Sequence, residues 1–317
     1  MQTLSFSNGD QMPILGLGTW KADPGEVGAA VTEAIKLGYR HLDCAAIYGN
    51  EAEIGAALQE LFAAGTVRRE ELWVTSKLWN NAHGKSQVPE ALRKTLDDLK
   101  LDALDLYLVH WPVATRPDVV YPSKPEHFVS LAELPLTETW AGMEACVSEA
   151  LARHIGVSNF CSDHLEELCQ AAAIRPEMNQ VELHPYLQQP ELVEYCRKKS
   201  IHLTAYSPLG SMDRPDVLKR ADEPSLLENG TVTEIAAAHG CSPAQVLLRF
   251  AIERDTAVIP KSTNPARLAE NLKAAELALT SGDMAALSGL DTGFRYVDGS
   301  FWTIEGSPYT LEDLWGE

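Results

Sequence analysis

Leu104-Asp105-Leu106-Tyr107-Leu108-Val109-His110 is the stretch of sequence that decides the fold. Its nearly continuous run of large apolar residues is typical of a parallel β-strand that is covered on both faces. The run ends on a polar residue, His110. We therefore expect a buried strand that brings a polar side chain to one edge of a parallel sheet.

Seven further runs of this kind occur along the chain, and helical patterns fill the intervals between them. One helix is predicted to start at Thr231, with Glu234 completing a capping box. No Pro/Gly/Ser-rich linker divides the chain, so the alternation predicts one α/β domain over residues 1–317, a closed (β/α)8 barrel of the TIM type. The eight predicted strands are Ile14 to Thr19, Arg40 to Cys44, Leu72 to Lys77, Leu104 to His110, Arg153 to Ser158, Glu177 to Leu183, Ile201 to Ser207 and Thr256 to Lys261.

Three segments depart from the regular alternation. Residues 1–13 contain Asn8-Gly9 between two short apolar runs, which predicts a β-hairpin that could plug the N-terminal mouth of the barrel. Residues 111–137 form a long, proline-punctuated loop, and residues 294–317 form an aromatic tail. Long segments of this kind are often functional, so we expect both to lie over the active-site face.

Composition excludes several classes of partner. The chain of 317 residues has 26 Lys and Arg against 45 Asp and Glu, a formal net charge of −19. Such a field repels nucleic acid and anionic membranes. There is no apolar run long enough to span a membrane and no secretory signal. The six cysteines include no Cys-x-x-Cys pair, so we expect reduced thiols, no metal site and a cytoplasmic location.

Polar residues fall where the predicted strands end, which in such a barrel is the catalytic face. Asp43, Lys77 and His110 close three successive strands, and Tyr48 follows Asp43 closely enough to return to the same mouth. A lone Lys after a strand is usually a solvated loop charge, and Asp43 could merely cap a helix. Polar residues also mark the later strands: Gln180 within the sixth, and Ser158-Asn159, Tyr206-Ser207 and Lys261-Ser262 at the ends of the fifth, seventh and eighth.

The set of Asp43, Tyr48, Lys77 and His110 suggests proton transfer to an oxygen. A free phenol has a pKa of about 10, and a neighbouring cation such as Lys77 can lower it by about 1 to 3 units. Asp43 would keep the buried ammonium charged, and His110 could orient a carbonyl group. No nucleophile elbow or metal triad accompanies them, so hydrolysis is disfavoured. A Schiff-base lyase that uses Lys77 is a weaker alternative, because Asp43 should keep that amine protonated.

A phosphate site is predicted near the end of the chain. Gly16-Leu17-Gly18 resembles part of a dinucleotide fingerprint but lacks the third glycine, so we interpret it as a strand and turn. Lys261-Ser262 and Arg267, at a helix start marked by Asn264-Pro265, combine two cations, a hydroxyl and a helix N-terminus. Tyr206 could stack on a flat ring such as nicotinamide.

Three ordered motifs carry a resemblance to a known family. They are residues 38–45 (GYRHLDCA) followed by Tyr48, Asn50 and Glu51; residues 153–160 (RHIGVSNF); and residues 259–262 (IPKS) followed by Arg267, Glu270 and Asn271. Through them the sequence resembles the aldo-keto reductase family over nearly its whole length. Cys44 departs from the family's usual Ser or Thr, and Gly49 stands between Tyr48 and Asn50.

This resemblance implies an NADPH-dependent oxidoreductase that reduces aldehydes or ketones to alcohols. Tyr48 would be the general acid in reduction and the base in oxidation, with Lys77, Asp43 and His110 in support. The cofactor NADP(H) would bind without a Rossmann domain, its 2′-phosphate held by Lys261, Ser262, Arg267 and Asn271. The full set of expected cofactor contacts is Gly18, Thr19, Trp20, Asp43, Ser158, Asn159, Gln180, Tyr206, Ser207, Leu209, Ser211, Lys261, Ser262, Thr263, Arg267, Glu270 and Asn271.

The substrate pocket rests on variable loops. We expect an apolar wall built from Trp20, Trp79, Trp111, Phe301 and Trp302, beside Tyr48 and His110. The partner would be a small-molecule carbonyl compound, and the family resemblance favours a monomer. The alternative is a regulatory or interaction protein that binds the cofactor on the same barrel with slow chemistry.

Overall fold

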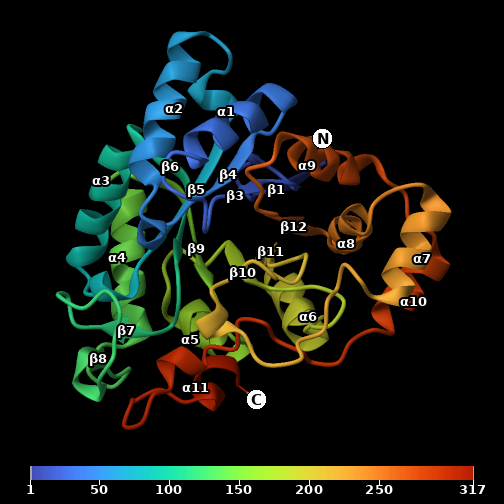
Figure 1. Ribbon diagram of the computed structural model, residues 1–317. Helices are drawn as coiled ribbons and strands as arrows, with labels where there is room; N and C mark the ends of the chain where they lie inside the picture. The colour runs from blue at the N-terminus through green and yellow to red at the C-terminus, as the bar shows by residue number, and fades with distance from the viewer. Residues whose placement is uncertain (1, 317) are drawn as a thin grey trace.

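The computed structural model describes residues 2–316 and shows a sheet of eight parallel strands surrounded by helices (Figure 1). Each strand pairs with the one that precedes it in the barrel, as the alternating βα pattern predicted. The strands in order are β3 (Leu17–Gly18), β4 (His41–Asp43), β5 (Trp73–Leu78), β6 (Leu104–Val109), β9 (Ala152–Ser158), β10 (Met178–Glu182), β11 (His202–Tyr206) and β12 (Thr256–Val258).

The sheet closes where β3 meets β12. Leu15 pairs with Val258 and Gly18 pairs with Lys261, both in parallel. The backbones of the two segments come very close here: a Cβ atom on Gly18 would lie 2.5 Å from the carbonyl oxygen of Ile259. Glycine is required because nothing larger fits against that backbone. This confirms the interpretation of Gly16-Leu17-Gly18 as strand and turn, although both seam strands are shorter than predicted.

Most of the helices lie outside the sheet, around its outer face (Figure 1). In chain order the helices are α1 (Val27–Leu37), α2 (Glu51–Ala63), α3 (Gln87–Leu99), α4 (Leu136–Ser148), α5 (Ser162–Ala171), α6 (Pro190–Lys199), α7 (Gly230–His239), α8 (Pro243–Ile252), α9 (Pro265–Leu272), α10 (Ser281–Ser288) and α11 (Leu311–Trp315). Helix α10 packs against α7, and α11 belongs to the C-terminal tail. None of these helices is both long and apolar enough to cross a membrane.

The predicted hairpin closes the N-terminal end of the barrel. Strands β1 (Thr3–Ser5) and β2 (Gln11–Pro13) pair antiparallel. Phe6, between them, packs on Trp73, His154 and His202, with ring centroids 4.9, 4.3 and 4.9 Å away. These three residues lie at or near the starts of β5, β9 and β11, so the plug is on the face opposite the strand ends.

The two predicted long segments lie over the other end. The segment after β6 contains a two-stranded ribbon of β7 (Ala114–Thr115) and β8 (Phe128–Val129), and α4 begins at Leu136, so the loop is slightly shorter than the predicted 111–137. The tail, defined here as residues 294–316, ends in α11. Tyr309 joins the two segments: its hydroxyl donates to Val129 O at 2.6 Å and accepts from Ala114 N at 2.9 Å.

Candidate active site

The structure brings the four predicted catalytic side chains together. Asp43 ends β4, Tyr48 ends a short 3₁₀ turn, Lys77 lies on β5, and His110 directly follows β6. Lys77 Nζ donates to Asp43 Oδ2 at 2.6 Å, to Cys44 O at 2.8 Å and to Tyr48 Oη at 3.3 Å. The Tyr48 and His110 rings meet edge to face, with centroids 5.9 Å apart. Lys77 is thus held behind Tyr48 by three acceptors.

Charge at this site is set by the Lys77–Asp43 ion pair. Burial lowers the pKa of Lys77, but Asp43 and Tyr48 outweigh burial, so the net shift is upward and the ammonium stays charged. Burial raises the pKa of Tyr48 to about 12, and Lys77 opposes that rise. The expected net lowering of the Tyr48 pKa is therefore wrong for the protein without ligands, because desolvation of the phenolate exceeds the effect of the cation. At neutral pH, Tyr48 carries its proton.

His110 is held neutral. Burial, and then the charge of Lys77, keep the pKa of its imidazole well below the usual range. Asn159 Nδ2 donates to the backbone carbonyl of His110 at 2.9 Å, and the Trp79 ring packs edge-on against the imidazole at 5.2 Å. A neutral imidazole in a fixed orientation can donate one hydrogen bond to a carbonyl oxygen without taking its proton.

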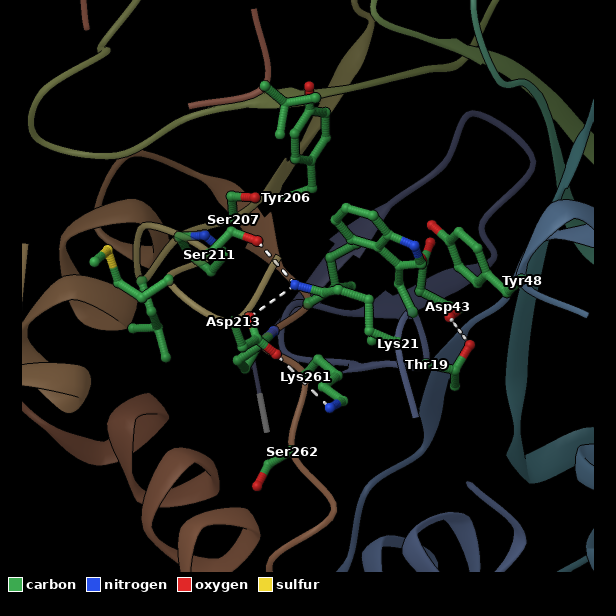
Figure 2. A pocket seen from close by; sticks show the side chains of 18 of the residues that line it. Thr19, Lys21, Asp43, Tyr48, Tyr206, Ser207, Ser211, Asp213, Lys261 and Ser262 are labelled. Atoms are coloured by element: carbon green, nitrogen blue, oxygen red, sulfur yellow. Dashed lines mark hydrogen bonds and ion pairs between the residues drawn. The ribbon is translucent and has the colours of Figure 1, made fainter. Parts of the chain in front are cut away.

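A cavity of about 970 Å³ lies at the carboxyl ends of the strands (Figure 2). All the predicted site residues except Lys77 line it: Gly18, Thr19, Trp20, Asp43, Tyr48, Trp79, His110, Trp111, Ser158, Asn159, Gln180, Tyr206, Ser207, Leu209, Ser211, Lys261, Ser262, Thr263, Arg267, Glu270, Asn271, Phe301 and Trp302. Lys77 contacts two of the lining residues, Asp43 and the hydroxyl of Tyr48.

The end of the cavity near Tyr48 is rich in amide and hydroxyl groups. Gln180 Nε2 donates to Asp43 Oδ1 at 2.7 Å, which ties this end to the ion pair. Ser158 Oγ donates to Gln180 O at 2.7 Å, and Tyr206 Oη donates to Asn159 Oδ1 at 2.8 Å. Groups of this kind can donate hydrogen bonds to a polar ligand and accept them from it.

Several cavity residues have a left-handed backbone although they are not glycine. The φ angles are 63° at Lys21, 64° at Asn159, 48° at Ser207 and 47° at Ser211. Each such residue costs on the order of 1–3 kcal/mol and persists only where the surrounding structure holds it. These four positions line the cavity and are therefore held by the structure around it.

The other end of the cavity carries positive charge. Lys261 lies beyond β12, and Arg267 lies exposed in the first turn of α9. Asn264 caps this helix: its Oδ1 accepts from the backbone N of Ala266 at 2.9 Å and of Arg267 at 3.2 Å. Two cations beside a helix N-terminus form a suitable site for a phosphate group.

A loop crosses the cavity between its two ends, and we call residues 209–227 the strap. Asp213 of the strap accepts from Lys21 Nζ at 2.7 Å and lies 3.7 Å from Lys261 Nζ, and Ser211 Oγ accepts from Lys21 at 3.1 Å (Figure 2). Lys21 and Asp213 were not predicted from the sequence, because Asp213 lies in a segment without periodicity. Further lining residues that were not predicted include Ile47, Tyr121, Pro122, Met212, Pro215, Val217, Leu218, Ser242 and Val297.

The tail completes an aromatic wall beside Tyr48 and His110. Trp302 lies 5.7 Å from both Trp79 and Trp111, and Phe301 lies 5.6 Å from Trp111, between ring centroids. On the other side, Trp20 stacks against Tyr48 at 6.3 Å. These rings give the cavity an apolar wall beside Tyr48 and His110.

Comparison with known proteins identifies the family. The sequence model of the aldo/keto reductase family matches residues 14–292. The chain belongs to this family. An aldo/keto reductase of Synechocystis is 56% identical over 317 residues, covering all of this chain and 97% of its own length. The family 1 member A1 aldo-keto reductase of Homo sapiens is 47% identical over 91% of this chain and 89% of its own.

A solved structure agrees with this membership. The aldose reductase of Schistosoma japonicum matches with a TM-score of 0.85 and 37% identity, covering 94% of this chain and 97% of its own. As an aldo-keto reductase, the protein is an oxidoreductase, and members of this family generally use NAD(P)H.

The residues fit such a cofactor. The cavity has amides and the Tyr206 ring at one end, Lys261 and Arg267 at the other, and a length of strap between them. Ser158, Asn159 and Gln180 would hold a carboxamide, and the cations would hold a phosphate.

Proposed function

We propose that the protein is an NADPH-dependent reductase of aldehydes and ketones, with Tyr48 as the acid that completes the alcohol. The observation that carries the proposal is the contact of the Tyr48 hydroxyl with a buried, charged Lys77, in a cavity that also holds a neutral His110. Cytoplasmic location, a monomeric state and a single domain over residues 1–317 stay predictions.

The chemistry that bound NADPH supplies is a hydride for the carbonyl carbon. Neutral His110 donates a hydrogen bond to the carbonyl oxygen and orients it. As negative charge develops on that oxygen, Tyr48 Oη gives up its proton to it, and the Lys77 ammonium at 3.3 Å stabilises the phenolate that forms. Asp43, at 2.6 Å from Lys77, keeps this cation in place. One hydride and one proton convert the carbonyl compound to the alcohol.

One observation supports the acid role of Tyr48, and another argues against the alternative role of Lys77. Its pKa of about 12 keeps the proton on the phenol until an alkoxide, which is a stronger base, develops beside it. The hydrogen bonds of Lys77 argue against a Schiff-base role for this residue, because its ammonium is held by three acceptors and stays protonated.

Removal of the Tyr48 hydroxyl tests the mechanism. Tyr48→Phe keeps the ring that stacks on Trp20, so we expect NADPH affinity to persist while kcat for a small aldehyde falls by about 10²- to 10⁴-fold. Tyr107→Phe is the matched control: Tyr107 is a fully buried phenol on β6 whose hydroxyl has no hydrogen-bond partner among the described residues. Turnover of the Tyr48→Phe variant equal to that of the control would exclude the proposed acid.

A further inference from the structure

The strap and the tail are separate in sequence but joined in the structure, and Tyr296 makes the junction. Its hydroxyl donates to Pro224 O of the strap at 2.6 Å. The guanidinium of Arg214, also in the strap and fully buried, lies 5.3 Å from the centre of the Tyr296 ring. At Gly210 the fit is close enough that a Cβ atom would lie 3.1 Å from the Tyr296 hydroxyl.

The strap has its own internal support at this point. Arg214 pairs with Glu223, and Glu223 also accepts from the backbone N of Arg220 at 2.8 Å. Arg220 in turn reaches across to the tail, where it donates to the backbone carbonyl of Arg295 and lies over the Phe294 ring at 4.5 Å. The strap is therefore bound to residues 294–296 at several points along its length.

The tail at this point is fixed to the barrel by a buried carboxylate. Glu182, the last residue of β10, accepts from the backbone N of Tyr296 at 2.6 Å and of Val297 at 2.8 Å. Its Oε1 also lies 2.8 Å from His184 Nε2. Because Glu182 is completely buried, these bonds form in a low-dielectric environment and are costly to break.

We propose that Tyr296 is a positioning residue for the cofactor, which holds the strap across the cavity by tying it to the tail that Glu182 fixes to β10. This inference rests on the proposed function, since it takes the ligand under the strap to be NADPH. The strap lines the cavity through Leu209, Ser211, Met212, Asp213, Pro215, Val217 and Leu218, between the amide end and the cationic end. A strap that is less firmly tied would release that ligand faster.

The chain offers a matched pair of substitutions for the test. Tyr296→Phe removes the hydroxyl that binds the strap and leaves the backbone bonds to Glu182 intact. Tyr309→Phe removes another buried tail hydroxyl, but Tyr309 binds the β7–β8 ribbon at Ala114 and Val129. The two variants therefore make the same chemical change, one at the strap and one away from it.

The measurement is the dissociation rate of NADPH, followed by the loss of its fluorescence after mixing with excess NADP+ in a stopped-flow instrument. We expect Tyr296→Phe to release NADPH about 3- to 10-fold faster and to raise the KM for NADPH, as the loss of one hydrogen bond predicts. The kcat/KM for the aldehyde should change little. Tyr309→Phe should leave the rate of NADPH release unchanged and raise the KM for a bulky aldehyde.

Arg220→Met is a second test of the link between strap and tail. Arg220 is exposed, so its replacement removes the hydrogen bond to the backbone carbonyl of Arg295 without disturbing the core. An unchanged rate of NADPH release in Tyr296→Phe would overturn the proposal. If Tyr296→Phe does not fold, an unchanged release rate in Arg220→Met would overturn it. Release that is accelerated equally in Tyr309→Phe would also overturn it. A wild-type protein that binds NADPH but reduces no aldehyde would overturn the proposed function, while the release rates would still decide the role of Tyr296.

Discussion

At the residue scale, we expect Lys261 and Arg267 to decide which cofactor the protein prefers. Both line the cationic end of the cavity beside the capped start of α9. We expect Lys261→Ala combined with Arg267→Ala to weaken NADPH binding roughly 100-fold, because two charge-assisted contacts to a phosphate are lost, and to change NADH binding little. Fluorescence titration with each cofactor measures this.

Lys273→Ala controls for the general loss of positive charge. Lys273 is exposed just after α9 and does not line the cavity. If the double variant weakens the binding of NADPH and NADH equally, Lys261 and Arg267 do not bind the 2′-phosphate.

The residues of the site could be predicted from sequence where they follow strands. Asp43, Lys77 and His110 stand at strand ends, and a barrel brings all such positions to one face. Asp213 could not be found this way, because its partners Lys21 and Lys261 reach it through the folded strap. The direction of the Tyr48 pKa shift could not be predicted either, since it depends on how completely the phenol is buried.

The N-terminal hairpin is held to the barrel, at the scale of elements, by a buried histidine. His154 lies between two carboxylates, with Nδ1 2.8 Å from Glu177 Oε2 and Nε2 2.9 Å from Asp10 Oδ2. Burial lowers the pKa of His154, but these two hydrogen bonds outweigh it, so the net shift is upward. The stabilisation is therefore complete below the unfolded pKa of about 6.5 and is lost as the pH rises through the folded value.

Unfolding by urea at several pH values tests this sign. We expect the free energy of unfolding of the wild type to exceed that of His154→Gln most at pH 6, and the difference to shrink toward pH 9. His202→Gln is the control, because His202 on β11 also contacts Phe6 of the plug. Burial lowers the pKa of His202, so its contribution should not decline over this range. A constant difference between wild type and His154→Gln would contradict the assignment.

Element boundaries were harder to predict than elements. The start of α7 is capped by Asn229, whose side chain accepts from Val232 N, whereas the sequence suggested Thr231 with Glu234. Both Asn and Thr are common N-cap residues, and in the structure Asn229 takes this position. The seam strands β3 and β12 are short because Pro260 has no N–H to extend the ladder.

Closure of the barrel depends on close backbone contact at one seam of the whole molecule. A Cβ atom on Gly18 would lie 2.5 Å from Ile259 O, so we expect Gly18→Ala to lower the free energy of unfolding by about 1–3 kcal/mol. Gly230→Ala is the control, because a Cβ atom there meets nothing within 4 Å and alanine suits the first turn of α7. Urea denaturation of both variants gives the comparison, and equal stabilities would show that the seam can relax.

The architecture as a whole was predictable because eight buried runs and their intervals repeat one physical unit. The path of the tail was not, since residues 294–316 carry aromatic rings but no period. What fixes that path is Glu182, inside a predicted strand and with no sequence signal for its partners at Tyr296 and Val297.

Strand β10 also sets limits on how this protein can be re-engineered. Gln180 and Glu182 lie two positions apart and therefore share one face of the strand, where one reaches Asp43 and the other holds the tail. A slip of one residue in the pairing with β9 and β11 would turn both side chains away at once. New substrate specificity is therefore best sought by exchanging tail residues beyond Val297, while β10 is left as the fixed part of the scaffold.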